Sequence, residues 1–131
     1  VQGTTYLLRV GGFNAASGTF GINVACTPAI PNNECTGAIA LNVGTNGPFG
    51  NAGSTASAPT WGCGSGVTKD VWFSYTASAN GPISVNTCTA TRTIDSVLQA
   101  FTGSCASLTS IACNDDFCST GSQLSFAAAT G

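Results

Sequence analysis

The chain has 131 residues and a formal net charge of −2, and with three basic side chains, five acidic side chains and no histidine its charged residues make up 6% of the sequence. The usual share is about 25%, and without a basic patch we exclude nucleic acid as a partner. No apolar run approaches the roughly 18 residues of a membrane-spanning helix, so no membrane span is expected. The length predicts one domain with a modest core.

The chain begins with a predicted β-hairpin over residues 1–26. Apolar residues recur there with a period of two, which predicts strands rather than helices. Turn-forming residues from Gly11 to Gly18 separate the two strands. The alternating apolar positions are Tyr6, Leu8, Val10, Phe20, Ile22 and Val24. We expect these side chains to contact a neighbouring unit, together with Cys26.

A linker and a body follow the hairpin. Residues 27–34 contain Pro28 and Pro31 and are predicted to be the linker, and residues 35–131 are predicted to be the body of the domain. The body keeps the period of two, with turn signals between its apolar segments. Across the whole chain we expect eight or nine short strands and no helix, which favours an antiparallel β-sandwich.

The two ends of the sequence read as one continuous unit. When residues 122–131 (SQLSFAAATG) are placed before residues 1–10 (VQGTTYLLRV), they form one strand–turn–strand segment. This is expected of one copy in a covalent tandem array, and equally of a subunit that donates its first strands to a neighbour. An open sheet edge leaves N–H and C=O groups unpaired, so a donated strand has a place to bind. Neighbouring copies of the chain are therefore the expected partners.

Seven cysteines indicate an oxidising compartment. Zinc-finger spacings are absent, so disulfides are the expected state of the thiols. Because the surface must consist largely of Ser, Thr, Asn and Gly, which are hydrated without charge and can carry glycans, we expect an extracellular or cell-surface protein. The predicted pairs are Cys113–Cys118, Cys88–Cys105 and Cys35–Cys63, with Cys26 left over. Cys26 is then free, paired with Cys35, or bonded to an adjacent unit.

Five motifs carry a resemblance to a known family. They are residues 31–38 (PNNECTGA), 69–75 (KDVWFSY), 94–98 (IDSVL), 111–116 (IACNDD) and 6–13 (YLLRVGGF). The chain resembles the bacterial pre-peptidase C-terminal domain, and more narrowly the cysteine-rich version that is repeated in large secreted proteins. In that family the PNNECTGA-like motif comes first and the YLLRVGGF-like hairpin last, so the order here is permuted.

The resemblance implies a jelly-roll-like β-sandwich that is usually non-catalytic. Such domains are appended to secreted enzymes or follow one another in arrays. A relative in bacterial collagenases binds collagen and calcium, which keeps a ligand-binding role open for this chain.

Catalysis is not expected. Without histidine, neither a Ser-His-Asp nor a Cys-His arrangement can form. A paired-carboxylate hydrolase needs two acids that face one cleft, and adjacent acids such as Asp115 and Asp116 point to opposite faces of a strand. Arg9 lies within an apolar strand, and if it is buried, Asp95 or Asp70 could pair with it as ordinary structural chemistry.

Calcium is the one cofactor that the sequence suggests. Asn114, Asp115 and Asp116 offer the hard oxygen ligands that Ca²⁺ prefers, in a segment between two cysteines. Asp95 is a further candidate ligand. The spacing is not that of an EF-hand loop, and the alternative is an Asx turn in which a side-chain oxygen bonds backbone N–H groups.

The aromatic residues leave two readings open. Trp61 and Trp72 could belong to a sugar-stacking surface, and Trp61 is the better candidate because Gly62, Cys63 and Gly64 follow it. The inner face of a sandwich usually takes up such side chains instead.

The function that these observations favour is a structural repeat unit of an extracellular filament or surface fibre. Units would be joined head to tail, by covalent repetition or by strand complementation, and locked by disulfides. The alternative is a non-catalytic carbohydrate- or protein-binding accessory domain of a secreted enzyme.

Overall fold

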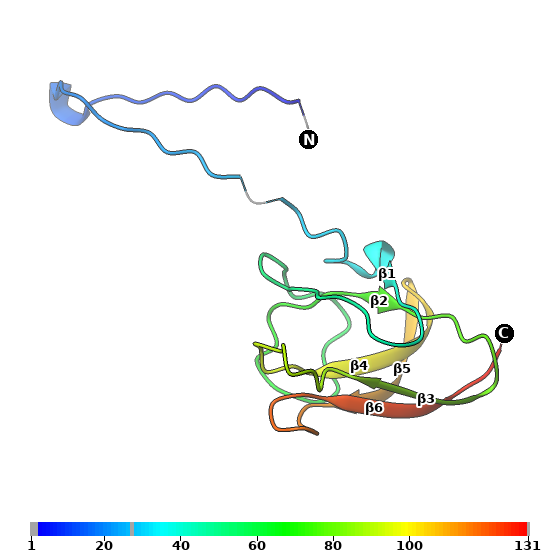
Figure 1. Ribbon diagram of the computed structural model, residues 1–131. Helices are drawn as coiled ribbons and strands as arrows, with labels where there is room; N and C mark the ends of the chain where they lie inside the picture. The colour runs from blue at the N-terminus through cyan, green and yellow to red at the C-terminus, as the bar shows by residue number, and fades with distance from the viewer. Residues whose placement is uncertain (1–2, 27, 131) are drawn as a thin grey trace.

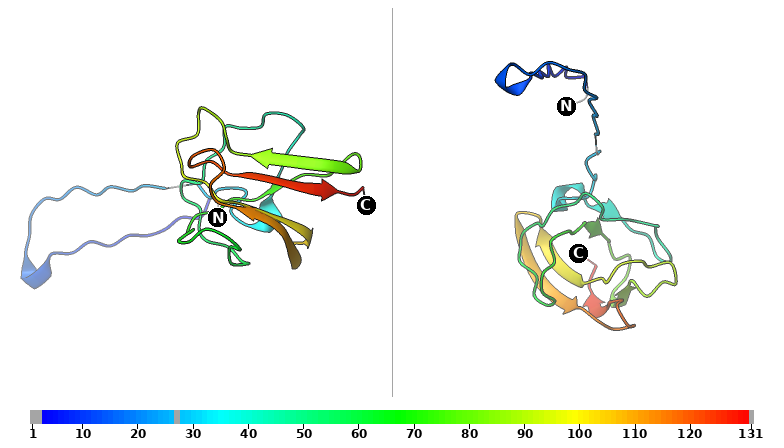
Figure 2. Two further views of the ribbon diagram at one scale, coloured as in Figure 1. Left: turned by 90° about the horizontal axis from the view of Figure 1, so that it is seen from below. Right: turned by 90° about the vertical axis from the view of Figure 1, so that its left-hand side faces the viewer.

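The computed structural model describes residues 3–26 and 28–130, and these form two distinct parts (Figure 1). Residues 3–26, here called the arm, extend away from residues 28–130, here called the body. The arm doubles back at its far end, next to η1 (Phe13–Ala15), as Figures 1 and 2 both show. Val1, Gln2, Thr27 and Gly131, which the predicted domain boundaries include, lie outside the described residues.

The described residues contain six strands and two short 3-10 turns, which confirms the expected all-β character. The strands are β1 (Ile39–Ala40), β2 (Phe73–Ser74), β3 (Gly81–Asn86), β4 (Leu98–Ser104), β5 (Ser107–Asn114) and β6 (Gln123–Ala128). They form three two-stranded sheets: β1 with β2 in parallel, β3 with β6 antiparallel, and β4 with β5 antiparallel. The second 3-10 turn, η2, spans Cys35–Gly37.

The expected count of eight or nine strands is not met. The two arm segments that the sequence predicts as strands are extended but belong to no sheet in the described chain. Alternating apolar residues favour an extended backbone, but a strand also needs a neighbouring backbone for its hydrogen bonds. Within residues 3–26 and 28–130, the arm has no such neighbour.

The β3–β6 pair contains the most deeply buried apolar side chain. Ile83 lies opposite Phe126 and Val85 opposite Leu124, so apolar residues meet on one face. Leu124 is 5% exposed and is the only buried large hydrophobic residue of the described chain. Burial in β3 alternates residue by residue, in agreement with the period of two in the sequence.

The β4–β5 hairpin depends on a glycine at its turn. Gly103 has a φ of 98°, and a Cβ at this position would collide with the carbonyl oxygen of Ser107. Only glycine meets both conditions. A register shift between Ala100 and Phe101 adds a bulge to the pair.

Buried hydroxyl groups join the two long sheets. The Ser122 side chain is fully buried and donates to the carbonyl oxygens of Ser96 and Asp115. The Ser122 N–H donates to the Thr87 hydroxyl at 3.0 Å, and the Thr87 N–H donates to the Ser122 carbonyl at 3.0 Å. Since buried polar groups cost free energy unless they are hydrogen-bonded, this cluster is stable because its members satisfy one another.

Three disulfides stabilise the body, and all three predicted pairings are wrong. The bonds are Cys35–Cys105, Cys63–Cys113 and Cys88–Cys118, with sequence separations of 70, 50 and 30 residues. Closing loops of this size contributes about 4 kcal/mol each in the chain-entropy model. The predicted Cys113–Cys118 bond does not form because Cys113 lies in β5 whereas Cys118 lies in the loop after it, so the two side chains reach different neighbours.

The folded part of the body begins before residue 35, where the sequence predicts that the linker ends and the body starts. Asn32 is buried, its amide group donates to the Trp72 carbonyl at 3.0 Å, and the Trp72 N–H donates to the Asn32 carbonyl at 2.8 Å. The Asn33 side chain accepts from the Thr55 N–H at 2.7 Å. These two residues are therefore part of the body.

A membrane-spanning helix would need a long apolar helical segment. In the part of the chain that the structure describes, no helix is long and apolar enough to cross a membrane.

Candidate inter-unit interface

The arm consists of two extended limbs that make no hydrogen bond to the body in the described chain. Residues 4–10 are the first limb and residues 19–25 the second limb. The one backbone hydrogen bond within residues 3–26 runs from the Ala16 N–H to the Phe13 carbonyl at 3.0 Å, at the tip. The arm therefore gains no support from the domain to which it is attached.

The arm exposes nearly all of its large apolar side chains. Leu7 is 95% exposed and Phe13 85%. The exposed set is Tyr6, Leu7, Leu8, Val10, Phe13, Phe20, Ile22 and Val24. It includes all six apolar positions that the sequence assigns to inter-unit contact. Contiguous apolar surface of this kind is uncommon on monomeric soluble proteins and is typical of interaction sites.

The tip of the arm is shaped by local sequence. Asn14 and Ala15 have φ values of 49° and 59°, in the left-handed region. A Cβ at Gly12 would collide with the Ala16 carbonyl oxygen, so this close approach requires glycine. The turn reverses the chain direction, and the two limbs diverge from it (Figures 1 and 2).

The body lacks apolar cover of its own. Apart from Leu124, its large apolar residues in the described chain are half-buried or exposed, and the buried positions are otherwise small or polar. The exposed body residues include Val43, Phe49, Phe117 and Ile94. The arm and the body thus have the same deficiency: each exposes apolar side chains that no other part of the described chain covers.

Cys26, the last residue of the arm, is an exposed free thiol. Its prediction as the leftover cysteine is confirmed. The other six cysteines are all paired within the body, so a disulfide between units would have to join the Cys26 residues of two copies. The bond itself stays a prediction.

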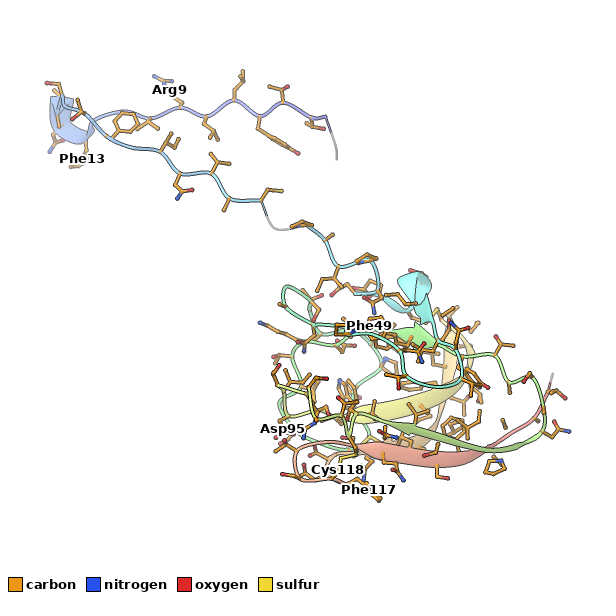
Figure 3. All side chains as sticks on the ribbon, viewed as in Figure 1. Arg9, Phe13, Phe49, Asp95, Phe117 and Cys118 are labelled. Atoms are coloured by element: carbon orange, nitrogen blue, oxygen red, sulfur yellow. A yellow bond between two sulfur atoms is a disulfide. The ribbon has the colours of Figure 1, made fainter. Side chains whose placement is uncertain are left out.

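Three of the four predicted calcium ligands lie close together. Carboxylate oxygens of Asp95, Asp115 and Asp116 all lie within 4.8 Å of one another. Figure 3 shows Asp95 at the left-hand side of the body. The Asn114 side-chain oxygen accepts from the Gln123 N–H at 3.0 Å, a bond to the start of β6 nine residues away and not the local bond of an Asx turn. Calcium prefers six to eight oxygens, so three carboxylates supply part of such a set and calcium stays a prediction.

The tryptophans are half-buried, which favours packing over sugar binding for Trp72. Its indole N–H donates to the Ser57 hydroxyl at 2.7 Å, and its ring centroid lies 5.6 Å from that of Phe101. The cavity next to Trp72 has about 50 Å³, whereas ligand sites typically have about 300–1,000 Å³. Trp61 lines this cavity and a more open hollow of about 270 Å³.

Arg9 is exposed on the arm, where Figure 3 shows it far from the body. Neither of the two acids considered as its partner is close. Asp70 is buried and accepts hydrogen bonds from the N–H and hydroxyl of Ser57 instead. Asp95 lies in the acidic group.

The sequence analysis missed the buried hydroxyl cluster around Ser122. Serine and threonine are common on the surface of this chain, and no periodicity distinguishes the few that are buried. A signal was available only in the position of Ser122 just before the apolar alternation of β6.

Comparison with known proteins adds no neighbour: no protein-family model, no curated protein and no solved structure matches the chain. The resemblance to the pre-peptidase C-terminal domain stays a prediction from its motifs.

Proposed function

We propose that the protein is a structural unit of an extracellular filament or surface fibre, in which the arm of each unit completes the body of the next. The observation that carries this proposal is the paired deficiency described above. The arm exposes eight large apolar residues, and the body buries one. Both deficiencies disappear when an arm covers a body other than its own.

The proposal also accounts for the small sheets. Each two-stranded sheet has unpaired edges, and two-stranded sheets are marginal by themselves. Two added limbs would enlarge them toward the antiparallel, jelly-roll-like sandwich that the motifs imply. The connection is either covalent, within a tandem array, or between separate chains, and the contacts are the same in both.

The disulfides fit the proposed location. Three disulfides in a chain of this size are typical of oxidising, extracellular compartments. The disulfides stabilise the body before assembly, when its sheets still lack the strands that a neighbouring unit would add.

The test uses the full chain and two matched variants of the first limb. Leu7 and Leu8 are adjacent, equal in type and on opposite faces of an extended backbone. The full chain should form head-to-tail polymers with rising concentration, measured by sedimentation velocity and electron microscopy. Leu8→Asp should raise the concentration needed for assembly at least about 100-fold, because an unpaired charge would be buried.

Leu7→Asp is the control, since its side chain points away from the covered face and a charge there should change assembly by less than about tenfold. A chain that stays monomeric at every concentration contradicts the proposal. Closed dimers that exchange arms reciprocally contradict the filament. Equal loss in both variants contradicts the assignment of Leu8 to the covered face.

A further inference from the structure

Two unpaired strand edges of the body, those of β2 and β4, belong to strands whose side chains are neighbours. We propose that the first limb of one copy inserts between β2 and β4 of a second copy and forms backbone hydrogen bonds with both strands. This inference rests on the proposed function and specifies the surface that receives the arm.

β2 offers one free edge. The carbonyls of Trp72, just before β2, and of Ser74, in β2, accept from the N–H groups of Ile39 and Leu41 at 3.2 Å and 2.8 Å. The backbone groups of Trp72 and Ser74 therefore face β1. Successive residues of a strand direct their N–H and C=O groups to opposite edges. Val71, Phe73 and Tyr75 therefore present theirs to the other edge, where no backbone group of the described chain bonds them.

β4 offers the second free edge. It pairs with β5 along its whole length, from Leu98 opposite Asn114 to Ser104 opposite Ser107. In the described residues, no strand or loop backbone bonds its other edge. A buried sheet edge without partners is costly, so this edge needs a strand or solvent.

The two strands are neighbours through their side chains although no backbone pairing joins them. The rings of Trp72, next to β2, and Phe101, in β4, lie 5.6 Å apart. One cavity of about 50 Å³ is lined by Val71 and Trp72 from the first segment and by Gln99 and Phe101 from the second. Figure 1 shows β2 above β4, with no strand between them.

Two disulfides connect the parts of the body on either side of this position. Cys35–Cys105 joins the segment before β1 to the β4–β5 turn, and Cys63–Cys113 joins the loop before β2 to β5. Covalent bonds thus keep β2 near β4 where backbone pairing does not. A site held in advance lowers the entropic cost of binding a strand.

The first limb fits this position better than the second. A strand with a partner on each side must supply N–H groups to both edges and tolerates neither proline nor many glycines. Residues 4–10 (TTYLLRV) contain neither and match β4 in length, whereas Gly21 interrupts the second limb. Tyrosine, leucine and valine in the first limb also suit a strand with one covered face.

The test is residue-resolved hydrogen exchange of assembled full-length chains, which are then dissolved in aprotic solvent and read by NMR. Between two strands, every amide of residues 5–10 is hydrogen-bonded, so all of them should exchange at least about 100-fold more slowly than in unassembled Leu8→Asp chains. On a single outer edge only alternate amides are hydrogen-bonded. Protection of every second residue would overturn the insertion and leave the proposed function intact. Assembly without protection in residues 5–10 would overturn both.

A pair of proline variants gives a second readout. Between two strands, both Leu7→Pro and Leu8→Pro should raise the concentration needed for assembly at least about tenfold, because each removes a hydrogen bond from one side. On an outer edge, the variant whose N–H faces solvent should assemble almost normally. Among the described residues the first limb makes no hydrogen bond to the body, and Figure 1 shows it away from the body, so neither variant should alter thermal unfolding of the unassembled body.

Discussion

The first limb and β3 are both short segments in which apolar residues alternate, yet they differ in structure. β3 pairs with β6 over its six residues, and its Ile83 and Val85 are half-buried. The first limb has no pairing partner in the part of the chain that the structure describes, and its Tyr6 and Leu8 are 74% and 68% exposed. The difference shows that alternation determines the capacity for a strand, while the presence of a second backbone determines whether a strand forms. The experiments below probe this contrast between arm and body.

The largest expected effect is on proteolysis. Chymotrypsin cleaves extended chain next to large apolar residues, so in the unassembled chain it should cut at Tyr6, Leu8 and Phe13 at least about 1,000-fold faster than within residues 35–130. Mass spectrometry of a time course measures the ratio. Assembly should remove the difference, because a paired limb cannot enter a protease site. Equal cleavage rates in the arm and the body would contradict the conclusion that the arm is unpaired while the body is folded.

Removal of one disulfide should weaken the body and spare the arm. Cys63→Ser combined with Cys113→Ser opens a loop of 50 residues between the paired cysteines, and we expect a loss of about 4 kcal/mol in the free energy of unfolding. Denaturant titration measures it. Cys26→Ser is the matched control and should change this free energy by less than about 0.5 kcal/mol, because Cys26 is exposed and free.

A smaller effect is expected from the buried hydroxyl cluster. Ser122→Ala removes a fully buried donor and leaves the Ser96 carbonyl and the Asp115 carbonyl without it, which should cost about 1–3 kcal/mol of stability. Ser125→Ala, at an exposed position of the adjoining strand β6, is the control and should cost less than about 0.5 kcal/mol. Equal losses in the two variants would show that the cluster has no special role.

The smallest expected effect is that of calcium on the body. If Ca²⁺ binds at Asp95, Asp115 and Asp116, a tenfold excess over its Kd should stabilise the body by about 1.4 kcal/mol, and chelation should reverse the increase in melting temperature. Asp116→Asn should reduce the increase, while an equal concentration of Mg²⁺ should give less of it. An identical melt with calcium and with chelator would contradict the prediction.

Several properties of the body could be predicted from local sequence. The period of two predicts an all-β chain, and the six strands agree with it. The cysteine content predicts disulfides with Cys26 left over, and this is the observed state. These properties depend on residue type and on neighbours two positions apart, both of which are visible in the sequence.

Which residues come together was decided by the tertiary structure. The predicted disulfide pairs were all wrong, because the observed bonds join segments 30 to 70 residues apart that only the fold brings together. The sequence placed Asp95 with Asp115 and Asp116 as calcium ligands, but it did not show that the Asn114 side-chain oxygen accepts a hydrogen bond from the Gln123 N–H.

The sequence by itself determined that residues 4–10 and 19–25 can be strands with one apolar side. Only the tertiary structure decided that, among the residues it describes, these two segments stay unpaired and β2 and β4 keep free edges. The physical reason is that side-chain alternation is a local property, whereas a backbone hydrogen bond needs a donor and an acceptor from segments that the fold brings together.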